Sequence, residues 1–271
     1  MQRLTLLIVT LLIQITAYAQ LNWIHDLRAA QALSLSEKKL IVMDFWAIWC
    51  SPCREMDHHL WNHEEMATLS NNFIPLKVDI DHHRDLAQKY AANAIPKVVI
   101  TDANGTVIWE EVGFQNVDYY LDILKNLPTD LDKLNKCLIP ILHGSEDAQH
   151  HFNVGIAYQR VSKQTDHLAL RSAFLQQSSN AFKQAQKRSE DTILDEQASL
   201  HLVLNDAYAG KTNRALRKVG KLDHLTAEAS EDLKRFIQAY CYQCDGKTET
   251  AKSLMANIKN QRYITELKEL P

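Results

Sequence analysis

Two cysteines separated by two residues are the clearest chemical feature of the sequence. Cys50 and Cys53 follow an apolar segment, 40–46, and stand where a helical pattern begins. A helix N-terminus presents free N–H groups and a partial positive charge, which stabilise a thiolate and lower its pKa from about 8.5. Cys50 is therefore predicted to be the nucleophile, and Cys53, one helical turn later, the thiol that resolves the mixed disulfide. Pro52 suits a first helical turn, where a missing N–H costs nothing.

A C-x-x-C pair alone does not distinguish redox chemistry from half of a structural zinc site. Residues 21–127 resemble thioredoxin, and this likeness favours redox chemistry. It is carried by the two cysteines together with Asp44, Trp46, Trp49, Ile95 and Pro96. The resemblance implies a thioredoxin fold, a central mixed sheet with flanking helices, and thiol–disulfide oxidoreductase activity. The redox group would be the Cys50–Cys53 disulfide, with no further cofactor and no metal.

The resemblance also implies roles for residues outside the pair. The aspartate at the Asp44 position is buried beneath the second cysteine and takes or returns its proton, and the lysine at the Lys77 position lies near that carboxylate. The proline at the Pro96 position is cis and packs against the disulfide, and the backbone of Ile95 pairs with the substrate chain. Further substrate contacts are expected from Trp49, Ser51 and Pro52.

Two of these roles also have a physical basis in the residues themselves. Burial in an apolar strand would raise the pKa of Asp44 toward the range useful for proton transfer. The alternative is that Asp44 points to solvent from the other face of the strand. Pro96 directly precedes a β-rich run, where an ordinary trans proline at the first strand position is also allowed.

The sequence departs from thioredoxin around the cysteines. Ser51-Pro52 replaces Gly-Pro, and no proline interrupts residues 54–61. This stretch, with residues 62–65 and 75–79, looks more like the C-terminal domain of bacterial membrane thiol–disulfide interchange proteins, which pass electrons outward to periplasmic clients. A strongly oxidising family would carry a histidine between the cysteines. A reductase or disulfide-exchange role is therefore expected, with disulfide-bearing client proteins and an upstream thiol donor, such as a membrane thiol–disulfide transporter, as partners.

Residues 1–19 are predicted to be a signal peptide. Arg3 precedes an apolar stretch at 4–15, and Ala-Tyr-Ala at 17–19 forms a small-x-small cleavage site. An uncleaved membrane anchor is the alternative, but the stretch is shorter than the ~20 residues of a spanning helix. No later segment is long and apolar enough to span a bilayer. The mature protein is therefore expected in the periplasm or another extracytoplasmic space, where disulfides persist.

The remaining chain predicts two domains of different architecture. Four β-rich runs alternate with amphipathic segments, at 40–46, 74–80, 97–101 and 106–112. This alternation is typical of an α/β layer structure, and Asp-Ala-Asn-Gly at 102–105 predicts a tight hairpin between the last two strands. Beyond Pro128 the β-branched runs vanish. We expect a thioredoxin-like domain at 20–128 and an α-helical domain at 129–271.

The helical half contains a local recurrence. Gly210-Lys211-Thr212 with Ala215 reappears as Gly246-Lys247-Thr248 with Ala251, so the interval from position 210 to position 246 is 36 residues. Such an interval fits a helix-turn-helix repeat and resembles tetratricopeptide repeats. An earlier pair of helices, at 152–163 and 168–187, would form a third unit. Generic antiparallel helix packing is the alternative.

Other possible sites have simpler interpretations. Cys241 and Cys244 form a second C-x-x-C, but they lie on an apolar helical stripe, so core packing with raised thiol pKa values is expected. Cys137 has no assigned role. The pairs His58-His59, His82-His83 and His150-His151 are predicted to be solvated, because neighbouring helical side chains point about 100° apart.

Charge and composition limit the partners and leave two function classes. The formal net charge of -3 gives no global field for a polyanion, so nucleic acid is not expected as a partner. The leading hypothesis is an extracytoplasmic reductase whose helical half selects or docks its client. The alternative is an adaptor protein whose helical repeats bind a partner and whose thioredoxin-like domain is mainly a scaffold.

Overall fold

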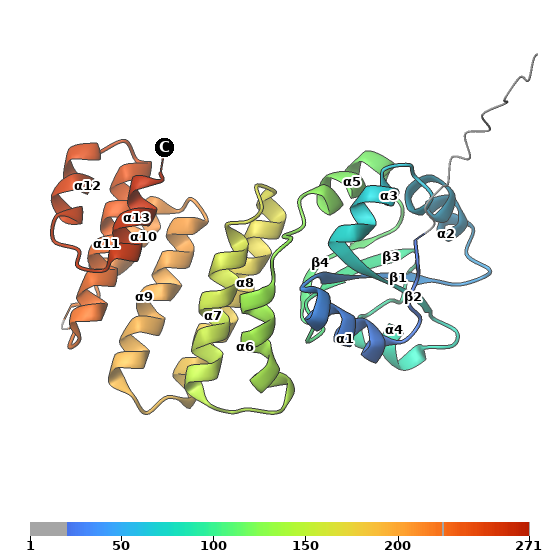
Figure 1. Ribbon diagram of the computed structural model, residues 1–271, viewed down its shortest axis with the longest axis horizontal. Coiled ribbons are helices and arrows are strands. Elements are labelled where there is room, and N and C mark those ends of the chain that lie inside the picture. Colours follow the sequence, from blue (N-terminus) through green and yellow to red (C-terminus); the bar gives the residue numbers. More distant parts are fainter. Residues whose placement is uncertain (1–20, 224, 271) are drawn as a thin grey trace, which may run out of the picture.

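The computed structural model describes residues 21–223 and 225–270, which form a half with a β-sheet and a half made of helices, placed end to end (Figure 1). The predicted signal peptide lies outside the described residues. None of the helices in the described ranges combines the length and the apolar character needed to cross a membrane.

The first half contains one four-stranded mixed sheet. Its strands are β1 (Leu40–Trp46), β2 (Phe73–Asp79), β3 (Lys97–Thr101) and β4 (Val107–Val112). The strand order is β2-β1-β3-β4, with β2 parallel to β1 and the other two pairs antiparallel. The predicted hairpin joins β3 to β4, and Gly105 takes the positive φ of 80° that a side chain would resist. The expected thioredoxin fold is confirmed.

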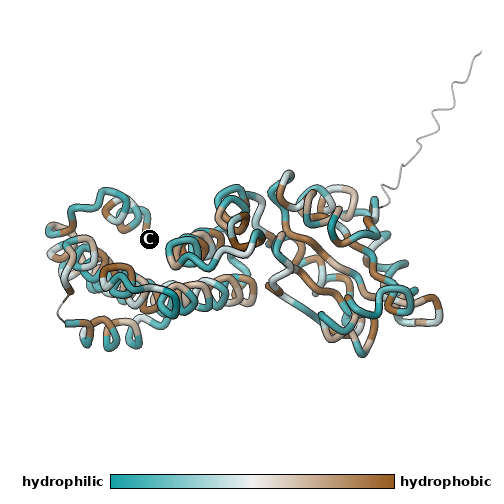
Figure 2. The backbone as a smooth tube through the Cα atoms, turned by 90° about the horizontal axis from the view of Figure 1, so that it is seen from below, coloured by the Kyte–Doolittle hydropathy of each residue, from teal (hydrophilic) through white to brown (hydrophobic). Residues whose placement is uncertain are grey.

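Helices cover both faces of this sheet. They are α1 (Leu27–Glu37), α2 (Ser51–Met56), η1 (Asp57–Trp61), α3 (Met66–Leu69), η2 (Ser70–Asn72), α4 (Arg84–Lys89) and α5 (Val117–Lys125). Side chains alternate along β1, so Leu40 and Val42 pack into the core under η1 and α5, while Ile41 and Met43 pack on the α1 and α4 side. Asp44 falls on the same face as Leu40 and Val42. Figure 2 shows the strands of the sheet as strongly hydrophobic segments.

The second half consists of helices packed against their neighbours in the chain. They are α6 (Asp132–Leu142), α7 (Ala148–Ser162), α8 (Leu168–Arg188), α9 (Thr192–Tyr208), α10 (Thr212–Val219), α11 (Glu228–Cys244), α12 (Thr248–Met255) and α13 (Gln261–Lys268). The recurrent sequence falls at two equivalent turns, where Gly210 and Gly246 have φ values of 73° and 74°. Ala215 and Ala251 are buried after each turn. The hairpins α9–α10 and α11–α12 therefore share one local design.

The two halves share one continuous apolar core. Leu40 and Val98 of the sheet belong to the same buried cluster as Leu134 and Phe174 of the helices. The hydroxyl of Tyr158 on α7 donates a hydrogen bond to Asp102 in the hairpin turn, and both residues are buried. The side chain of Asn135 donates to the backbone oxygen of Ser34 at 2.7 Å. The helical half thus covers one side of the sheet half through specific, buried contacts.

The second C-x-x-C pair differs in part from its prediction. Cys241 is buried in the core of the C-terminal helices, and burial raises the pKa of its thiol to about 12. Cys244 is exposed, so the prediction that both thiols pack in the core is wrong for this residue. Cys244 is the last residue of α11, so the apolar stripe ends there, and the chain turns at Gly246. Both thiols are free.

The histidine pair at 58–59 is exposed, as predicted, and its two rings are in contact. The rings of His58 and His59 meet edge to face, with 4.7 Å between their centroids. Both lie in η1, a π-helical turn whose hydrogen bonds span one residue more than those of an α-helix. The described residues contain no group of three or more His, Cys, Asp or Glu side chains placed to hold a metal ion.

Candidate active site

Cys50 and Cys53 form a disulfide at the point where the chain leaves β1 and enters α2. Their sulfurs are 2.05 Å apart and both residues are at most 4% exposed. Cys50 is the N-cap of α2, and its Sγ accepts a hydrogen bond from the backbone N–H of Cys53 at 3.2 Å. The predicted strand-to-helix placement is confirmed. The same N–H would stabilise a thiolate on Cys50 once the disulfide is reduced.

The disulfide packs against a small apolar wall. Ala47 is buried beside the two cysteines, and Trp46, Ile80 and Ile95 pack around them. The peptide bond between Ile95 and Pro96 is cis, as the resemblance implied. Trp46 at the end of β1 and Ile95 just before β3 are thus both brought to the disulfide.

The outer rim of the site is exposed and apolar. Trp49 is 62% exposed, and its indole N–H donates to Asp81 at 2.8 Å. Ile48 beside it is 75% exposed and was missed from the sequence. Ser51 and Pro52 are exposed at the start of α2. An apolar surface next to Cys50 offers a contact area for an incoming polypeptide.

Asp44 and Lys77 form a buried ion pair between β2 and β1, the strand that leads to Cys50. The Lys77 Nζ lies 2.9 Å from Asp44 Oδ2, and the two residues are paired in the register of β1 with β2. Burial raises the pKa of the Asp44 carboxyl, an effect that the neighbouring Lys77 opposes. The other carboxylate oxygen, Oδ1, is buried without a hydrogen-bond partner among the described residues. It is therefore an available proton acceptor.

Asp57 is a third member of this charged group that the sequence analysis missed. It lies at the start of η1 and forms an ion pair with Lys77, while its side chain is 34% exposed. Its spacing of four residues from Cys53 and the lysine on β2 were the available signals. Lys77 therefore connects the buried Asp44 to a carboxylate that reaches solvent.

Trp23 and Ile24, which precede α1, pack beside this charged group. Backbone hydrogen bonds join Ile24 to Pro75 and Lys77 along the edge of β2. This pairing places the ring of Trp23 4.9 Å from Lys77 Nζ, and the ring of Trp46 lies at 5.3 Å. Two aromatic faces and two carboxylates surround the ammonium group, which favours its charged form. The pKa of Lys77 is accordingly raised, because Asp44 and Asp57 outweigh its burial.

Comparisons with known proteins agree with this geometry. Residues 26–123 match the family model of thioredoxin. Mitochondrial thioredoxin of Bos taurus is 37% identical over 87 residues, which cover 32% of this chain and 51% of that protein. The chain thus spans about half the length of this relative. Thioredoxin of Mycoplasma genitalium is 28% identical over 105 residues, which cover 38% of this chain and 99% of that protein.

Part of the chain is also similar to solved structures. The oxidised DsbD C-terminal domain of Neisseria meningitidis is 25% identical with a TM-score of 0.33, covering 38% of this chain and 97% of that one. Thioredoxin NaTrxh from Nicotiana alata is 28% identical with a TM-score of 0.30, covering 36% of this chain and 79% of that one. From the family match and the geometry of the disulfide, residues 26–123 are a thioredoxin-like oxidoreductase domain, whose disulfide joins Cys50 and Cys53.

Proposed function

We propose that this protein is an extracytoplasmic thiol–disulfide oxidoreductase that reduces or exchanges disulfides in client proteins. The observation that carries the proposal is the Cys50–Cys53 disulfide at the start of α2, where the Cys53 N–H donates to Cys50 Sγ and the strand that leads to it holds the buried Asp44. This arrangement supplies both a stabilised thiolate and a proton acceptor. A location outside the cytoplasm is supported by the signal-peptide pattern at residues 1–19.

The proposed reaction begins with the reduced protein. The Cys50 thiolate attacks one sulfur of the client disulfide, a mixed disulfide forms, and the other client sulfur leaves as a thiolate. Cys53 then gives its proton to Asp44 and attacks Cys50 Sγ, which releases the second client thiolate. The client gains two electrons and the Cys50–Cys53 disulfide closes. An upstream dithiol, such as that of a membrane thiol–disulfide transporter, would return two electrons to the protein.

The helical half is proposed to select or dock the client. It packs at the end of the sheet half opposite α2, so it does not cover the disulfide (Figure 1). The exposed Ile48 and Trp49 offer contacts to any extended chain, which gives little selectivity. A second surface on the same rigidly packed protein would supply the missing specificity.

The test uses the chain from residue 20 onward and two single-cysteine variants. Cys53→Ala should accumulate mixed disulfides with client proteins through Cys50, whereas Cys50→Ala should not, because only the Cys50 sulfur has the N-cap position that stabilises a thiolate. Trapped species are counted on non-reducing gels. Equal trapping by both variants, or by neither, contradicts the assigned roles.

The adaptor alternative makes a different prediction for the thiols. If the thioredoxin domain were only a scaffold, reduced Cys50 would react with iodoacetamide no faster than an ordinary thiol at neutral pH. The proposal predicts that reduced Cys50 is alkylated rapidly even at a pH below about 8.5, the ordinary pKa of a cysteine thiol. Equilibration with glutathione then fixes whether the protein acts as a reductant or as an exchange catalyst.

A further inference from the structure

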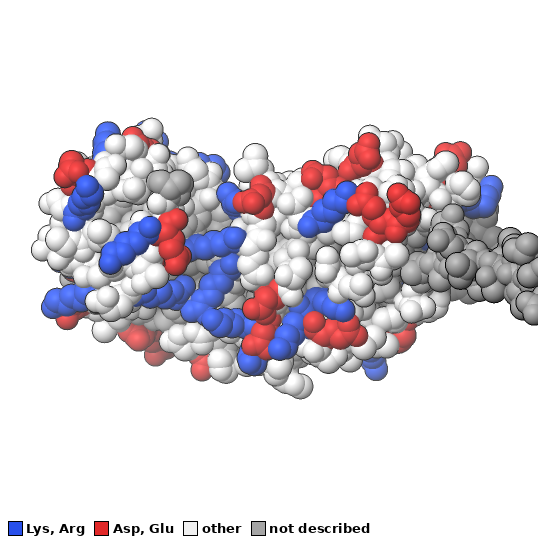
Figure 3. All heavy atoms as spheres, turned by 45° about the horizontal axis from the view of Figure 1, so that its top comes forward, with Lys and Arg blue, Asp and Glu red and all other residues white. Residues whose placement is uncertain are grey.

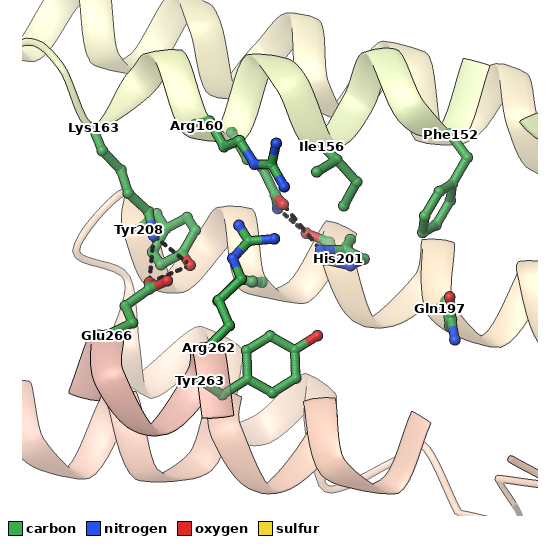
Figure 4. Close-up of a pocket in the computed structure, with 12 residues that line it drawn as sticks. Phe152, Ile156, Arg160, Lys163, Gln197, His201, Tyr208, Arg262, Tyr263 and Glu266 are labelled. Carbon is green, nitrogen blue, oxygen red and sulfur yellow. Dashed lines mark hydrogen bonds and ion pairs between the residues drawn. The ribbon is translucent and has the colours of Figure 1, made fainter. Parts of the chain in front are cut away.

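A second candidate site lies in the helical half, far from the disulfide in the fold. It is a cavity of ≈ 180 Å³ between α7, α9 and α13 (Figure 4). Its volume is below the roughly 300–1,000 Å³ of pockets that hold drug-sized ligands, so it suits a smaller group. None of its lining residues belongs to the redox site.

Two arginines reach into this cavity from opposite walls. Arg160 extends from α7 and Arg262 from α13, and Figure 4 shows their guanidinium groups directed into the same space. Among the residues that the structure describes, neither guanidinium has a hydrogen-bond or ion-pair partner. The pKa of Arg160 is lowered by burial and by the charge of Arg262. Two converging guanidiniums with free donors are suited to a bidentate anion such as a carboxylate.

The acidic residue in the lining does not neutralise these arginines. Glu266 forms an ion pair with Lys163 and accepts a hydrogen bond from the hydroxyl of Tyr208 at 2.5 Å. Lys163 also donates to the Tyr208 hydroxyl at 2.9 Å. This closed group occupies one end of the cavity and leaves the charges of the arginines uncompensated. Figure 3 shows many Lys and Arg side chains on one face of the helical half.

His201 adds a hydrogen-bond acceptor next to the arginines. The side-chain nitrogen of Gln159 donates to the His201 carbonyl and to Asn205, which directs the Gln159 oxygen toward His201 Nδ1 at 2.9 Å. Nδ1 therefore carries the proton, and Nε2 is left as an acceptor to which no described residue donates. Burial lowers the pKa of His201 to about 3, so the ring is neutral at physiological pH. The residue is only 8% exposed.

The rest of the wall is apolar. Phe152, Ile156 and Leu204 line the cavity beside the polar groups. A matching ligand has a carboxylate, a neighbouring N–H donor and a small apolar body. An ammonium group next to the carboxylate would be repelled by Arg160 and Arg262, whereas an amide N–H would not.

We propose that this cavity binds an N-acylated amino-acid group through its carboxylate. Arg160 and Arg262 hold the carboxylate, His201 Nε2 accepts the amide N–H, and the apolar wall receives the side chain. The same chemistry occurs in small N-acyl amino acids and in the last residue of a polypeptide. The proposal does not depend on the redox function.

The test measures binding of defined probes to the full chain from residue 20 by fluorescence anisotropy. The probes are labelled peptides ending in each of the standard amino acids, as free acids, as C-terminal amides and with the last amide nitrogen methylated. Some free acids should bind, and the matching amides and methylated peptides should bind at least tenfold more weakly. Competition by unlabelled N-acetyl amino acids distinguishes the two sources: equal potency assigns small molecules, and much weaker competition assigns polypeptide ends.

Protein variants complete the test. Arg160→Gln and Arg262→Gln should each weaken binding of the free acids on the order of tenfold or more, because each removes a charged hydrogen bond. Arg217→Gln is the matched control, since this exposed arginine lies on α10 outside the cavity. Thermal melting confirms that the variants fold. The proposal is overturned if no free acid binds, if amides bind equally well, or if the Arg160 and Arg262 variants behave like the control.

Discussion

The ammonium group of Lys77 lies 2.9 Å from the carboxylate of Asp44, at facing positions of two parallel strands. Lys77 also forms an ion pair with Asp57, so one cation joins a buried carboxylate to a half-exposed one. A proton taken from Cys53 by Asp44 therefore has polar groups along which it can reach solvent. Substitutions of Asp44, Lys77 or Asp57 are therefore expected to change both the stability of the fold and the rate at which the mixed disulfide is resolved.

Asp44→Asn should slow the resolution of the mixed disulfide more than its formation. The asparagine keeps the shape of the side chain but cannot take the Cys53 proton, and general base catalysis typically contributes 10²–10⁴-fold. We expect resolution to slow by about 10² or more. Stopped-flow tryptophan fluorescence with a model disulfide separates the two steps. Equal rates of resolution in wild type and variant would remove Asp44 from the mechanism.

Asp57→Asn should have a smaller effect on the same step. Asp44 remains as the proton acceptor, but the route from Lys77 to the half-exposed carboxylate is lost. We expect a slowing on the order of tenfold at most, well below that of Asp44→Asn. Asp118→Asn is the matched control, because Asp118 is exposed in the first turn of α5 and does not contact Lys77. If Asp57→Asn slowed resolution as much as Asp44→Asn does, this would contradict the role of Asp44 as the direct proton acceptor.

Lys77→Met should destabilise the oxidised protein strongly at neutral pH. The methionine fills the space of the lysine stem but leaves Asp44 buried without its counter-ion. Breaking a buried ion pair in this way typically costs about 3–5 kcal/mol. Asp44→Asn should cost less, because Lys77 retains Asp57 as its partner. Urea unfolding of both variants gives the comparison, and the reverse order would contradict it.

The stability of the oxidised protein should depend on pH through Asp44. Because burial raises its folded pKa above the ordinary 3.8, the folded state holds this proton more tightly than the unfolded chain does. The free energy of unfolding contributed by Asp44 is therefore highest below pH 3.8 and decreases as the pH rises through the folded pKa. Asp44→Asn should lack this decrease. Urea unfolding curves of wild type and variant, from about pH 4 to about pH 8, should diverge with rising pH, and parallel curves would count against a buried Asp44.

Tyr158→Phe should weaken the packing of the helical half on the sheet half. The variant removes the hydroxyl that donates to the buried Asp102, while the backbone N–H donors of Asn104 and Thr106 remain. Loss of one donor to a buried carboxylate costs about 1–3 kcal/mol. Tyr119→Phe is the control, because its hydroxyl contacts Glu111 at the surface and its removal should stay within about 0.5 kcal/mol. Similar urea midpoints for the two variants would contradict a structural role for the Tyr158 contact.

Local sequence patterns determined the redox element and the sheet. The apolar run before Cys50 and the Pro52 after it specify a strand followed directly by a helix, whatever the rest of the chain does. The alternation of β-rich and amphipathic segments specified the α/β class, and Asn104-Gly105 specified a hairpin because glycine accepts a positive φ. The recurrence of Gly210 at Gly246 likewise marked two equivalent helix turns before any packing was known.

Only the tertiary structure decided which distant residues meet. Asp57 joins Lys77 because η1, which continues α2, brings it to the lysine on β2, and no local pattern encodes that approach. The exposure of Cys244 depends on where α11 ends, and helix ends are set by capping and packing beyond the stripe itself. The cavity between Arg160 and Arg262 brings together residues about a hundred positions apart in sequence. The positive charge of the cavity is not neutralised because Glu266 is already paired with Lys163. That pairing exists only once α13 packs beside α7.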